Sequence, residues 1–560
     1  MSPTEESHDV PPARHPWRRL VAASIALGAI MIAAFPPLDL WWTIFLAPTA
    51  LAIAATTTLR FRWIATILFL PAFAAWLHHQ WWVGAVSGAG LVPLVAYLAA
   101  WTPLLAWMIR RIHGHPSLGR LPMAILLPVL WTGTEYVRAT IALEGYPWYL
   151  LGQPLVEWLP LAQPAAIGGI TLLAVLPAAV GGLFADVLMR RPRTGRIALG
   201  VGTLAVGWLA FGLATVTPPG SGRPGPVVLA IQTNLPQSNK VAWTPTQQWE
   251  DAVGFARDTV SAFEEASRTH DRIDLVAWPE TMLPGVGLDP ATTNAFERAG
   301  WWPGNRFVEL ATDLQRMLGV PLLLGSAAMD GVAFEGEGAE AVIEWDRRFN
   351  SVYLLDENGP AAATRYDKVV LTPFGERMPY ISEWPWLEQR LLDLGARGMS
   401  FDLASGETPR RLALDDQVSI GTPICFEDTV PEACRRLVWS EGAKAGSLLI
   451  NASNDGWFGS SPGPRAAHLQ LARVRAIENR VPMVRAVNTG ITAWIDSCGR
   501  IRAASRPLEA GWLVAETELD DRRPIFAMIG QAPAGLLAIA AAGLVGCTLL
   551  PRRRTPDPVS

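Results

Sequence analysis

Long apolar segments at both ends of the chain constrain its fold more than any other feature. Eight windows are long enough to cross a hydrocarbon core of about 30 Å. They lie near residues 20–35, 40–58, 63–80, 90–109, 121–137, 161–189, 197–217 and 530–550. Helices are the natural way to span a membrane, because they satisfy their own backbone hydrogen bonds. The sequence therefore predicts about seven membrane helices within residues 20–217 and another over 529–550. The sixth window is longer than one span needs, which indicates a tilted or broken helix.

Arginine clusters predict how these helices are oriented. One cluster precedes the first span, and others follow the second, fourth, sixth and eighth spans. They are Arg14, Arg18 and Arg19; Arg60 and Arg62; Arg110, Arg111 and Arg120; Arg190, Arg191, Arg193 and Arg196; and Arg552, Arg553 and Arg554. Basic loops stay in the cytoplasm, so residues 1–19 and 551–560 are predicted to be cytoplasmic and residues 218–528 to lie outside. A signal peptide over the first 35 residues is the alternative, although no small-residue cleavage site is obvious.

The region between the spans reads as a separate domain over residues 226–520. Pro218–Gly225, rich in proline and glycine, is a linker. Short apolar runs then alternate with helical stretches, and the Asn-Gly within Asp356–Gly359 predicts a hairpin turn. Strands are expected at Val227–Thr233, Ile273–Glu280, Val320–Ser326, Phe349–Leu355, Ala363–Val370, Ser447–Ala452, Val481–Val487 and Thr492–Ile495, and helices at Thr246–Ser267, Phe307–Leu318, Pro431–Gly442 and Arg465–Asn479. This pattern favours a mixed α/β domain with helices on the sheet faces.

Three apolar segments lead to a reactive side chain: Ile273–Glu280 ends in Glu280, Tyr366-Asp367 precedes Lys368, and a further expected strand, Val418–Ile424, precedes Cys425. A thiol with a pKa of about 8.5 needs a base at neutral pH. Glu280 is the candidate base, since burial raises the pKa of a carboxyl group. Lys368 is one of only three lysines in the chain, which suggests that a compact ammonium is needed there. Taken singly, the cysteine could be a small buried apolar residue, the glutamate a capping group and the lysine incidental.

Other site types find little support in the composition. The four cysteines form no CxxC pair or Cys/His cluster, so structural zinc is not predicted. The net charge of −4 gives no indication of nucleic-acid binding. No metal or cofactor is expected.

The motifs around the three residues resemble the nitrilase (carbon–nitrogen hydrolase) superfamily with its Glu-Lys-Cys triad. The matching segments are Trp278–Glu280, Tyr366–Glu376, Ile424–Glu427, Asn234–Gln237, Asn454–Gly459, Ala472–Glu478 and Arg485–Thr492. Within this superfamily, the flanking spans are similar to those of the apolipoprotein N-acyltransferase family. Two segments in the membrane part, Phe35–Asp39 and Gly145–Trp148, are similar to loop motifs of the same family. The fold that the resemblance implies is an αββα sandwich joined to a polytopic helical membrane domain.

The resemblance also implies roles for individual residues. Glu280 matches the general base, Lys368 the oxyanion-stabilising lysine and Cys425 the nucleophile. Three further residues match supporting positions: Glu376, Phe426 and Glu427. Aromatic residues expected to contact substrate are Trp243, Phe374, Trp384, Trp386 and Trp148.

Parts of the chain depart from the family pattern or remain ambiguous. Val241 lies near the place of an expected tryptophan, and Trp243 comes two residues later. Asp289–Arg306 and Phe334–Arg348 read as insertions. The apolar stretch Glu376–Arg410 is a lid, an interfacial contact or a loop packed on its own domain.

The implied activity is acyl transfer in two steps through a cysteine thioester. The donor would be a membrane phospholipid and the acceptor the N-terminal α-amine of a diacylglyceryl apolipoprotein. The enzyme would lie in the bacterial inner membrane with its catalytic domain on the periplasmic side. One alternative is a membrane-tethered amidase or nitrilase. A more remote one is a transporter, which the few charges within the spans (Glu135, Asp186) do not favour.

Overall fold

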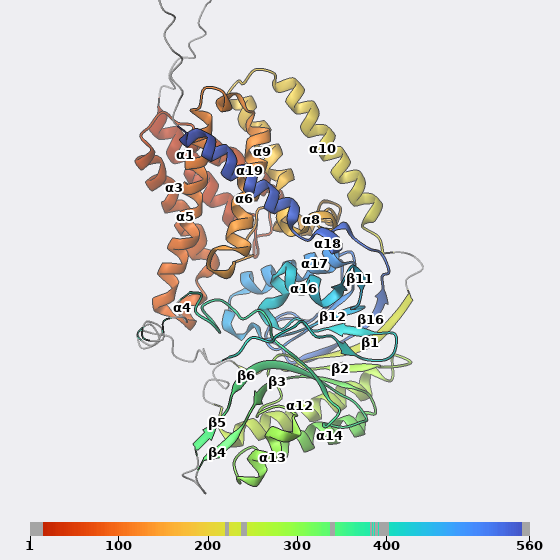
Figure 1. The fold of residues 1–560 in the computed structure, drawn as a ribbon. Coiled ribbons are helices and arrows are strands. Elements are labelled where there is room, and N and C mark those ends of the chain that lie inside the picture. Colours follow the sequence, from red (N-terminus) through yellow and green to blue (C-terminus); the bar gives the residue numbers. More distant parts are fainter. Residues whose placement is uncertain are drawn as a thin grey trace, which may run out of the picture.

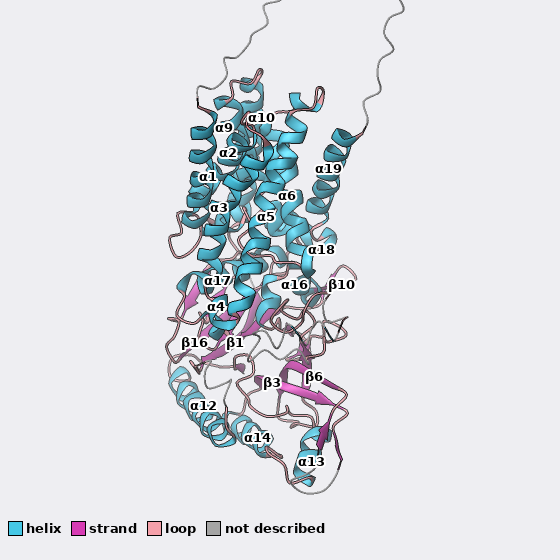
Figure 2. Ribbon diagram, turned by 90° about the vertical axis from the view of Figure 1, so that its left-hand side faces the viewer, coloured by secondary structure: helices cyan, strands magenta, loops and turns pink. Residues whose placement is uncertain are grey.

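A bundle of helices is stacked on a domain built from two β-sheets (Figures 1 and 2). The computed structural model describes residues 15–218, 223–236, 243–335, 342–380, 384, 386, 390 and 403–550. The described residues leave out the terminal segments 1–14 and 551–560 and part of the linker. They also leave out most of the apolar stretch Glu376–Arg410.

Five helices of the described chain are long and apolar enough to cross a membrane. They are α1 (Pro16–Ala33), α3 (Phe61–Gln80), α5 (Gly88–His113), α10 (Thr194–Thr215) and α19 (Ala532–Leu549). The second predicted window forms a shorter apolar segment, η1 (Trp41–Leu46) followed by α2 (Ala47–Ala55). The fifth window forms α6 (Met123–Thr140), which packs among the others.

The sixth window is broken, as its length suggested. It contains α7 (Leu159–Ala162), α8 (Ala165–Leu172) and α9 (Val175–Leu188). Helices α8 and α9 are bent by 60° relative to each other and count as a sixth span if they are taken together. Within α8, Gly169 has a φ of 79°, and the following Ile170 N–H donates to Glu478 Oε1 at 2.7 Å. A carboxylate from the sheet domain thus satisfies backbone that this kink within α8 leaves unpaired.

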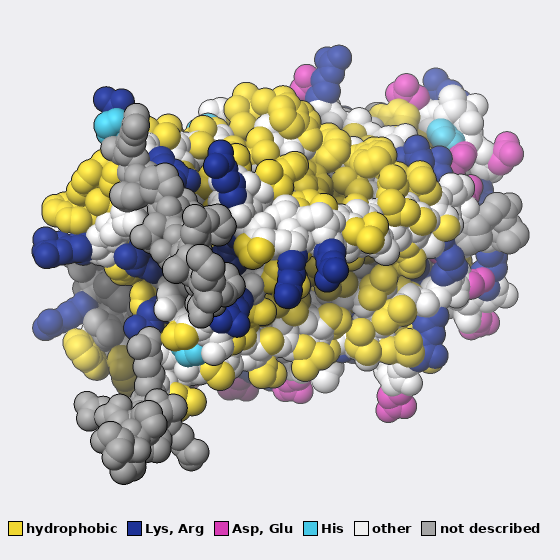
Figure 3. Space-filling model, turned by 90° about the horizontal axis from the view of Figure 1, so that it is seen from above, with side chains coloured by type: hydrophobic (Ala, Val, Ile, Leu, Met, Phe, Trp, Pro, Cys, Tyr) yellow, Lys and Arg dark blue, Asp and Glu magenta, His cyan; other side chains and the backbone are white. Residues whose placement is uncertain are grey.

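Three of the predicted basic clusters, those near Arg60, Arg110 and Arg191, meet at the end of the bundle opposite the sheets. Arg110 donates to the carbonyls of Thr57 and Leu59 at 2.6 and 2.9 Å. Arg191 donates to the carbonyl of Leu121 at 2.6 Å. Viewed from this end, Lys and Arg side chains stand among hydrophobic ones (Figure 3).

The sheet domain contains two six-stranded mixed sheets. The first has the strand order β16-β1-β2-β3-β6-β7 and the second β15-β14-β13-β12-β9-β8. The first comprises β1 (Arg223–Gln232), β2 (Leu275–Ala277), β3 (Leu322–Asp330), β6 (Arg347–Leu355), β7 (Thr364–Asp367) and β16 (Gly511–Leu519). The second comprises β8 (Leu412–Ala413), β9 (Ser419–Gly421), β12 (Leu448–Ser453), β13 (Met483–Val487), β14 (Ala493–Ile495) and β15 (Ile501–Ala504).

Alternating side chains of the strands bury both faces of the first sheet. On β1, Val228 and Ala230 join the core between the sheets, whereas Leu229 and Ile231 face α12 (Pro245–Ala266) and α14 (Arg306–Leu318). On the second sheet, α16 (Pro431–Val438) and α17 (Pro462–Asn479) lie between the strands and the membrane bundle (Figure 1). The layer order is therefore αββα, as the resemblance implied.

Helix α17 joins the two halves of the molecule. Its Ala472 and Ala476 pack toward the sheets, while Leu471 and Val474 pack with the membrane helices. The helix is therefore buried on both sides, and residues placed on it are held by both domains.

The two apparent insertions form local structure at the end of the sheet domain farthest from the bundle (Figure 1). Asp289–Arg306 contains α13 (Pro290–Arg298), and Phe334–Arg348 contains much of the hairpin β4 (Ala333–Glu335) and β5 (Val342–Glu344). The helix expected over Pro431–Gly442 ends earlier, at Val438, because the chain then forms the short ladder β10 (Trp439–Ser440) and β11 (Ala443–Lys444). Short elements complete the described chain: α4 (Val83–Val86), η2 (Leu118–Arg120), η3 (Ala142–Glu144), η4 (Gln153–Glu157), η6 (Cys425–Thr429), η7 (Asp455–Phe458) and α18 (Ile525–Ile529).

Candidate active site

Cys425 lies at a sharp turn after β9. Ile424 still pairs with Ala452 of β12 in a parallel bridge, and Cys425 then begins the short helix η6 with a φ of 49°. A non-glycine residue in this left-handed region is uncommon and is typical of functional turns. Cys425 is partly exposed, whereas the next four residues of η6 are buried. The turn therefore presents the thiol at the end of the sheet.

Glu280 follows β2 and is almost completely buried. Its Oε1 accepts a hydrogen bond of 2.7 Å from Asn350 Nδ2. Its Oε2 is buried and has no hydrogen-bond partner among the described residues. One carboxylate oxygen is thus fixed in place, and the other is free to take up a proton.

Lys368 follows β7 and is only 1% exposed. Its Nζ lies 2.7 Å from Glu376 Oε2 and 2.9 Å from Oε1. Glu376 also accepts hydrogen bonds from the Thr372 N–H at 2.8 Å and from Asn350 Nδ2 at 3.3 Å. Asn350, which sequence reasoning did not single out, therefore donates to both glutamates.

The electrostatics indicate that these side chains lie close enough to act on one another. Burial raises the pKa of the Cys425 thiol well above its ordinary value, the charge of Glu280 raises it further, and Lys368 opposes both. Burial alone would lower the pKa of Lys368, but the charges of Glu376, Cys425 and Glu280 outweigh this effect and raise it. Burial likewise opposes the ionisation of Glu376, yet Lys368 lowers the pKa of that carboxyl group. Lys368 and Glu376 thus form a stable ion pair beside a protonated thiol.

Glu427 connects the lysine segment to the cysteine turn. Its two oxygens accept hydrogen bonds from Tyr366 Oη and from the backbone N–H groups of Val369, Val370 and Ile424, all within 2.8–2.9 Å. Burial raises the pKa of this carboxyl group, although the backbone donors oppose the rise. This geometry fits a carboxylate that fixes the position of Cys425 relative to Lys368.

Two of the predicted aromatic residues lie at the junction with the membrane bundle. Phe426 is buried and packs with residues of the membrane helices. Trp148, from the loop after α6, is also buried, and its ring centroid lies 5.9 Å from Phe458 and 5.4 Å from the imidazole of His468.

The remaining predicted aromatic residues occupy other surroundings. Phe374, Trp384 and Trp386 are exposed. Trp243 lies just before α12, where its indole donates to Asp251 and its ring packs with the core beneath that helix. The structure thus separates Trp243, at the outer helical layer, from the exposed group after Lys368.

A second buried group of charged residues, not anticipated from the sequence, lies behind the cysteine turn. His468 of α17 contacts Asp428 at 2.6 Å through Nε2 and Asp455 at 3.0 Å through Nδ1. Arg485 of β13 lies 3.8 Å from Asp428 and 3.9 Å from Asp455. All four side chains are almost completely buried. We refer to His468, Asp428, Asp455 and Arg485 as the charge quartet.

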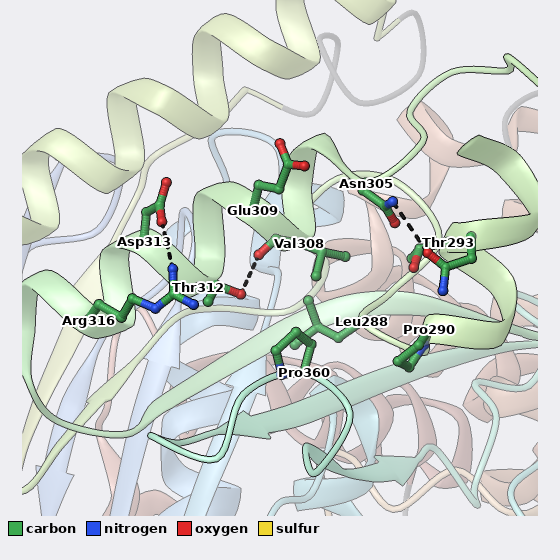
Figure 4. Close-up of a pocket in the computed structure, with 11 residues that line it drawn as sticks. Leu288, Pro290, Thr293, Asn305, Val308, Glu309, Thr312, Asp313, Arg316 and Pro360 are labelled. Atoms are coloured by element: carbon green, nitrogen blue, oxygen red, sulfur yellow. Dashed lines mark hydrogen bonds and ion pairs between the residues drawn. The ribbon is translucent and has the colours of Figure 1, made fainter. Parts of the chain in front are cut away.

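An open groove beside the insertion helix α13 is a different feature (Figure 4). It runs between α13 and α14, and its polar side chains already bond to one another: Arg316 pairs with Asp313 at 3.3 Å, and Thr312 donates to the Val308 carbonyl. None of Glu280, Lys368 and Cys425 lines it. Among the residues that the structure describes, no group of three His, Cys, Asp or Glu side chains is arranged to hold a metal ion.

Comparisons with known proteins agree with this architecture. Residues 236–525 match the model of the carbon–nitrogen hydrolase family, and residues 27–183 match that of the apolipoprotein N-acyltransferase N-terminal domain. The apolipoprotein N-acyltransferase of Geobacter metallireducens is 30% identical over 94% of this chain and 94% of its own length. That of Vibrio parahaemolyticus is 28% identical over 96% of this chain and 99% of its own. Among solved structures, a carbon–nitrogen hydrolase from Helicobacter pylori covers 55% of this chain and 94% of its own, with 14% identity and a TM-score of 0.35.

The αββα domain and its Glu, Lys and Cys side chains define a carbon–nitrogen hydrolase fold carried by a membrane helix bundle. Both halves of the chain match a family model, and the Geobacter relative matches almost from end to end. The chain belongs to the apolipoprotein N-acyltransferase family.

Proposed function

We propose that this protein transfers a fatty acyl chain from a membrane phospholipid, through a thioester on Cys425, to the α-amine of an N-terminal diacylglyceryl-cysteine on a lipoprotein. The observation that carries the proposal is that Glu280, Lys368 and Cys425 act on one another electrostatically, beside Phe426, which packs against a bundle of apolar helices. The names of the relatives supply the acceptor class.

In the first step, Glu280 acts as the general base. Its free Oε2 takes the proton of Cys425, and the sulfur attacks the ester carbonyl of the phospholipid. The Lys368 ammonium, held by Glu376, stabilises the negative charge that develops on the carbonyl oxygen. The ester C–O bond then breaks, Glu280 returns the proton to the leaving alkoxide, and a lysophospholipid departs.

In the second step, the α-amine of the acceptor attacks the thioester. An α-amine has a pKa near 8, so part of it is neutral at physiological pH. Glu280 accepts the proton that the nitrogen loses as the amide bond forms. The C–S bond breaks, and Cys425 recovers a proton from Glu280 as the thiol.

The aromatic residues fit contacts with the lipid and its surroundings. Phe374, Trp384 and Trp386 are exposed and follow Lys368 in the chain, where large apolar side chains suit an acyl chain or a membrane surface. Trp148 lies between the membrane loop and His468 and fits a wall of the site. Trp243, packed at α12, fits a more distant contact with the acceptor.

The proposed topology follows the basic clusters. Residues 1–19 and 551–560 are cytoplasmic, 20–217 form the membrane domain, 218–225 the linker, 226–520 the catalytic domain and 529–550 the last span. This places the catalytic domain on the periplasmic side of the bacterial inner membrane. The meeting of the Arg110 and Arg191 segments at one end of the bundle supports the assignment.

The two rival functions find less support. A tethered amidase would use the same three side chains with water as the acceptor. The described residues, however, include five or more helices that could span a membrane, and a simple anchor needs fewer. For a transporter, charges within the bundle should be free to bind a solute. Instead, both oxygens of Asp186 accept N–H groups, from Met123 and Ala124, and Oε1 of Glu135 accepts those of Trp131 and Leu151.

Peptide mass spectrometry tests the proposal. Detergent-purified protein is incubated with phosphatidylethanolamine and digested, with C425A as the matched control. A hydroxylamine-labile fatty-acyl mass on the Cys425 peptide, absent from C425A, is expected. Adding a diacylglyceryl-cysteine peptide should then remove this mass and acylate the peptide amine. A folded protein that forms no adduct would contradict the assigned donor.

A further inference from the structure

The charge quartet contains two carboxylates that share one imidazole. Asp428 and Asp455 each lie within hydrogen-bond distance of a different ring nitrogen of His468. A neutral imidazole carries only one N–H, so both hydrogen bonds form only with the imidazolium. Burial alone would lower the pKa of His468, but the adjacent carboxylates outweigh this and raise it to about 9. His468 is therefore positively charged at neutral pH.

The quartet is directly connected to the nucleophile. Asp428 lies on the same short helix, η6, three residues after Cys425. Asp455 begins η7, just after β12, which pairs with the strand that leads to the cysteine. Burial and Glu280 have the larger effects on the pKa of the Cys425 thiol, but the negative charge of Asp455 also raises it. A change in the charge of the quartet must therefore affect the thiol.

The quartet is electrically neutral only while His468 is protonated. Asp428 and Asp455 carry two negative charges, and His468 and Arg485 carry two positive ones. Arg465, on α17 like His468, is the other cation that acts on Asp455. Arg485 approaches both carboxylates no closer than 3.8 Å, and its guanidinium makes no hydrogen bond to the described residues. The shorter contacts of His468 therefore provide the main neutralisation.

We propose that His468 is a positioning residue whose positive charge neutralises Asp428 and Asp455 behind the cysteine turn, so that Cys425 can ionise when Glu280 takes its proton. This role rests on the proposed function of Cys425 as the nucleophile. It extends the active site to α17, a helix that also contacts the membrane bundle through Trp148. His468 touches no reacting atom and acts through the two aspartates.

The test is the alkylation rate of Cys425 by iodoacetamide as a function of pH, read by mass spectrometry of the Cys425 peptide. Alkylation requires the thiolate and no lipid. The full-length protein in detergent is compared with H468Q, D428N and the double variant H468Q/D428N. H270Q is the matched control, since His270 lies 3.8 Å from a carboxylate, Glu516, on the outer surface of the domain. Lysophospholipid release from phosphatidylethanolamine is measured in parallel.

The predicted order of the alkylation midpoints depends on the net charge of the quartet, not on the number of hydrogen bonds that each variant loses. H468Q leaves the quartet with a net negative charge, so the alkylation midpoint should rise by about one pH unit and the rate at pH 7 should fall about tenfold. D428N leaves it net positive, so the midpoint should fall. The double variant restores neutrality and should return close to the wild-type profile, and H270Q should match the wild type.

Two results would overturn the inference: a wild-type profile for H468Q, or slower alkylation in both single variants with no recovery in the double one. If H468Q does not fold, as judged by size-exclusion elution and helical circular dichroism, the opposite shift in D428N and its reversal in the double variant still decide. If the alkylation order holds but the wild type releases no lysophospholipid, the electrostatic effect of His468 on the Cys425 thiol stands and the proposed function fails.

Discussion

Glu280 and Glu376 both accept hydrogen bonds from the single amide of Asn350, yet their surroundings differ. Glu376 is paired with Lys368, whereas Glu280 keeps one buried oxygen without a partner among the described residues. The sequence predicted both glutamates because their motifs are local. Asn350 went unnoticed within an apolar strand, although a polar residue in a buried run is itself a signal of a partner nearby.

At the same scale, Glu280→Gln should slow acylation of Cys425 by about 10²–10⁴-fold while the protein still folds. Glutamine keeps the acceptor oxygen for Asn350 but cannot remove the thiol proton. Single-turnover release of lysophospholipid measures the effect, and Cys425→Ala sets the background. Rapid thioester formation by the glutamine variant would exclude Glu280 as the base.

Glu376→Gln should act on stability as well as on rate. It leaves the Lys368 ammonium buried without its carboxylate, which typically costs about 3–5 kcal/mol. Because folding lowers the pKa of Glu376, its stabilising contribution is complete above the unfolded value near 4.5 and is lost as the pH falls through the lower folded value. Thermal unfolding in detergent from pH 7 down to pH 3 should therefore show a smaller acid-induced loss in the variant than in the wild type. If the thermal stability of the variant and of the wild type falls equally with pH, the ion pair does not contribute to stability.

At the scale of the elements, local patterns located the central strands and the helices that cover them. The strand β16 went unpredicted, although it alternates buried and exposed residues, because its partner β1 lies almost 300 residues earlier in the chain. The charge quartet was not predicted either, because its residues lie far apart in the sequence. The elements that carry them, η6, η7, α17 and β13, come together only in the folded domain. The break in the sixth window was anticipated from length alone, and a separate kink at Gly168 and Gly169 lies within α8.

The kink at Gly169 yields a prediction about α8. Gly169→Ala should destabilise the protein by about 1–3 kcal/mol, because φ is 79° there and an added Cβ would lie 2.9 Å from Phe526. Gly200→Ala, in α10, is the matched control: an added Cβ there meets no atom within 4 Å, and alanine favours a helix interior. Melting temperatures in one detergent should fall for the first variant and stay level or rise for the second. A melting temperature for Gly169→Ala at or above that of the wild type would show that the kink does not require glycine.

At the scale of the whole molecule, the site works only if the sheet domain lies on the side where the lipoproteins mature. The proposed topology places Ser267, at the end of α12, outside and Ser117, in the loop after α5, in the cytoplasm. Both side chains are exposed, so a cysteine at either position can react with a water-soluble probe. In a background lacking Cys425 and Cys547, the other cysteines being buried, S267C should react with a membrane-impermeant maleimide in cells whose outer membrane has been opened. S117C should react only after the inner membrane is dissolved. The opposite pattern would invert the bundle and place the thiol in the cytoplasm, where exported lipoproteins would not reach it.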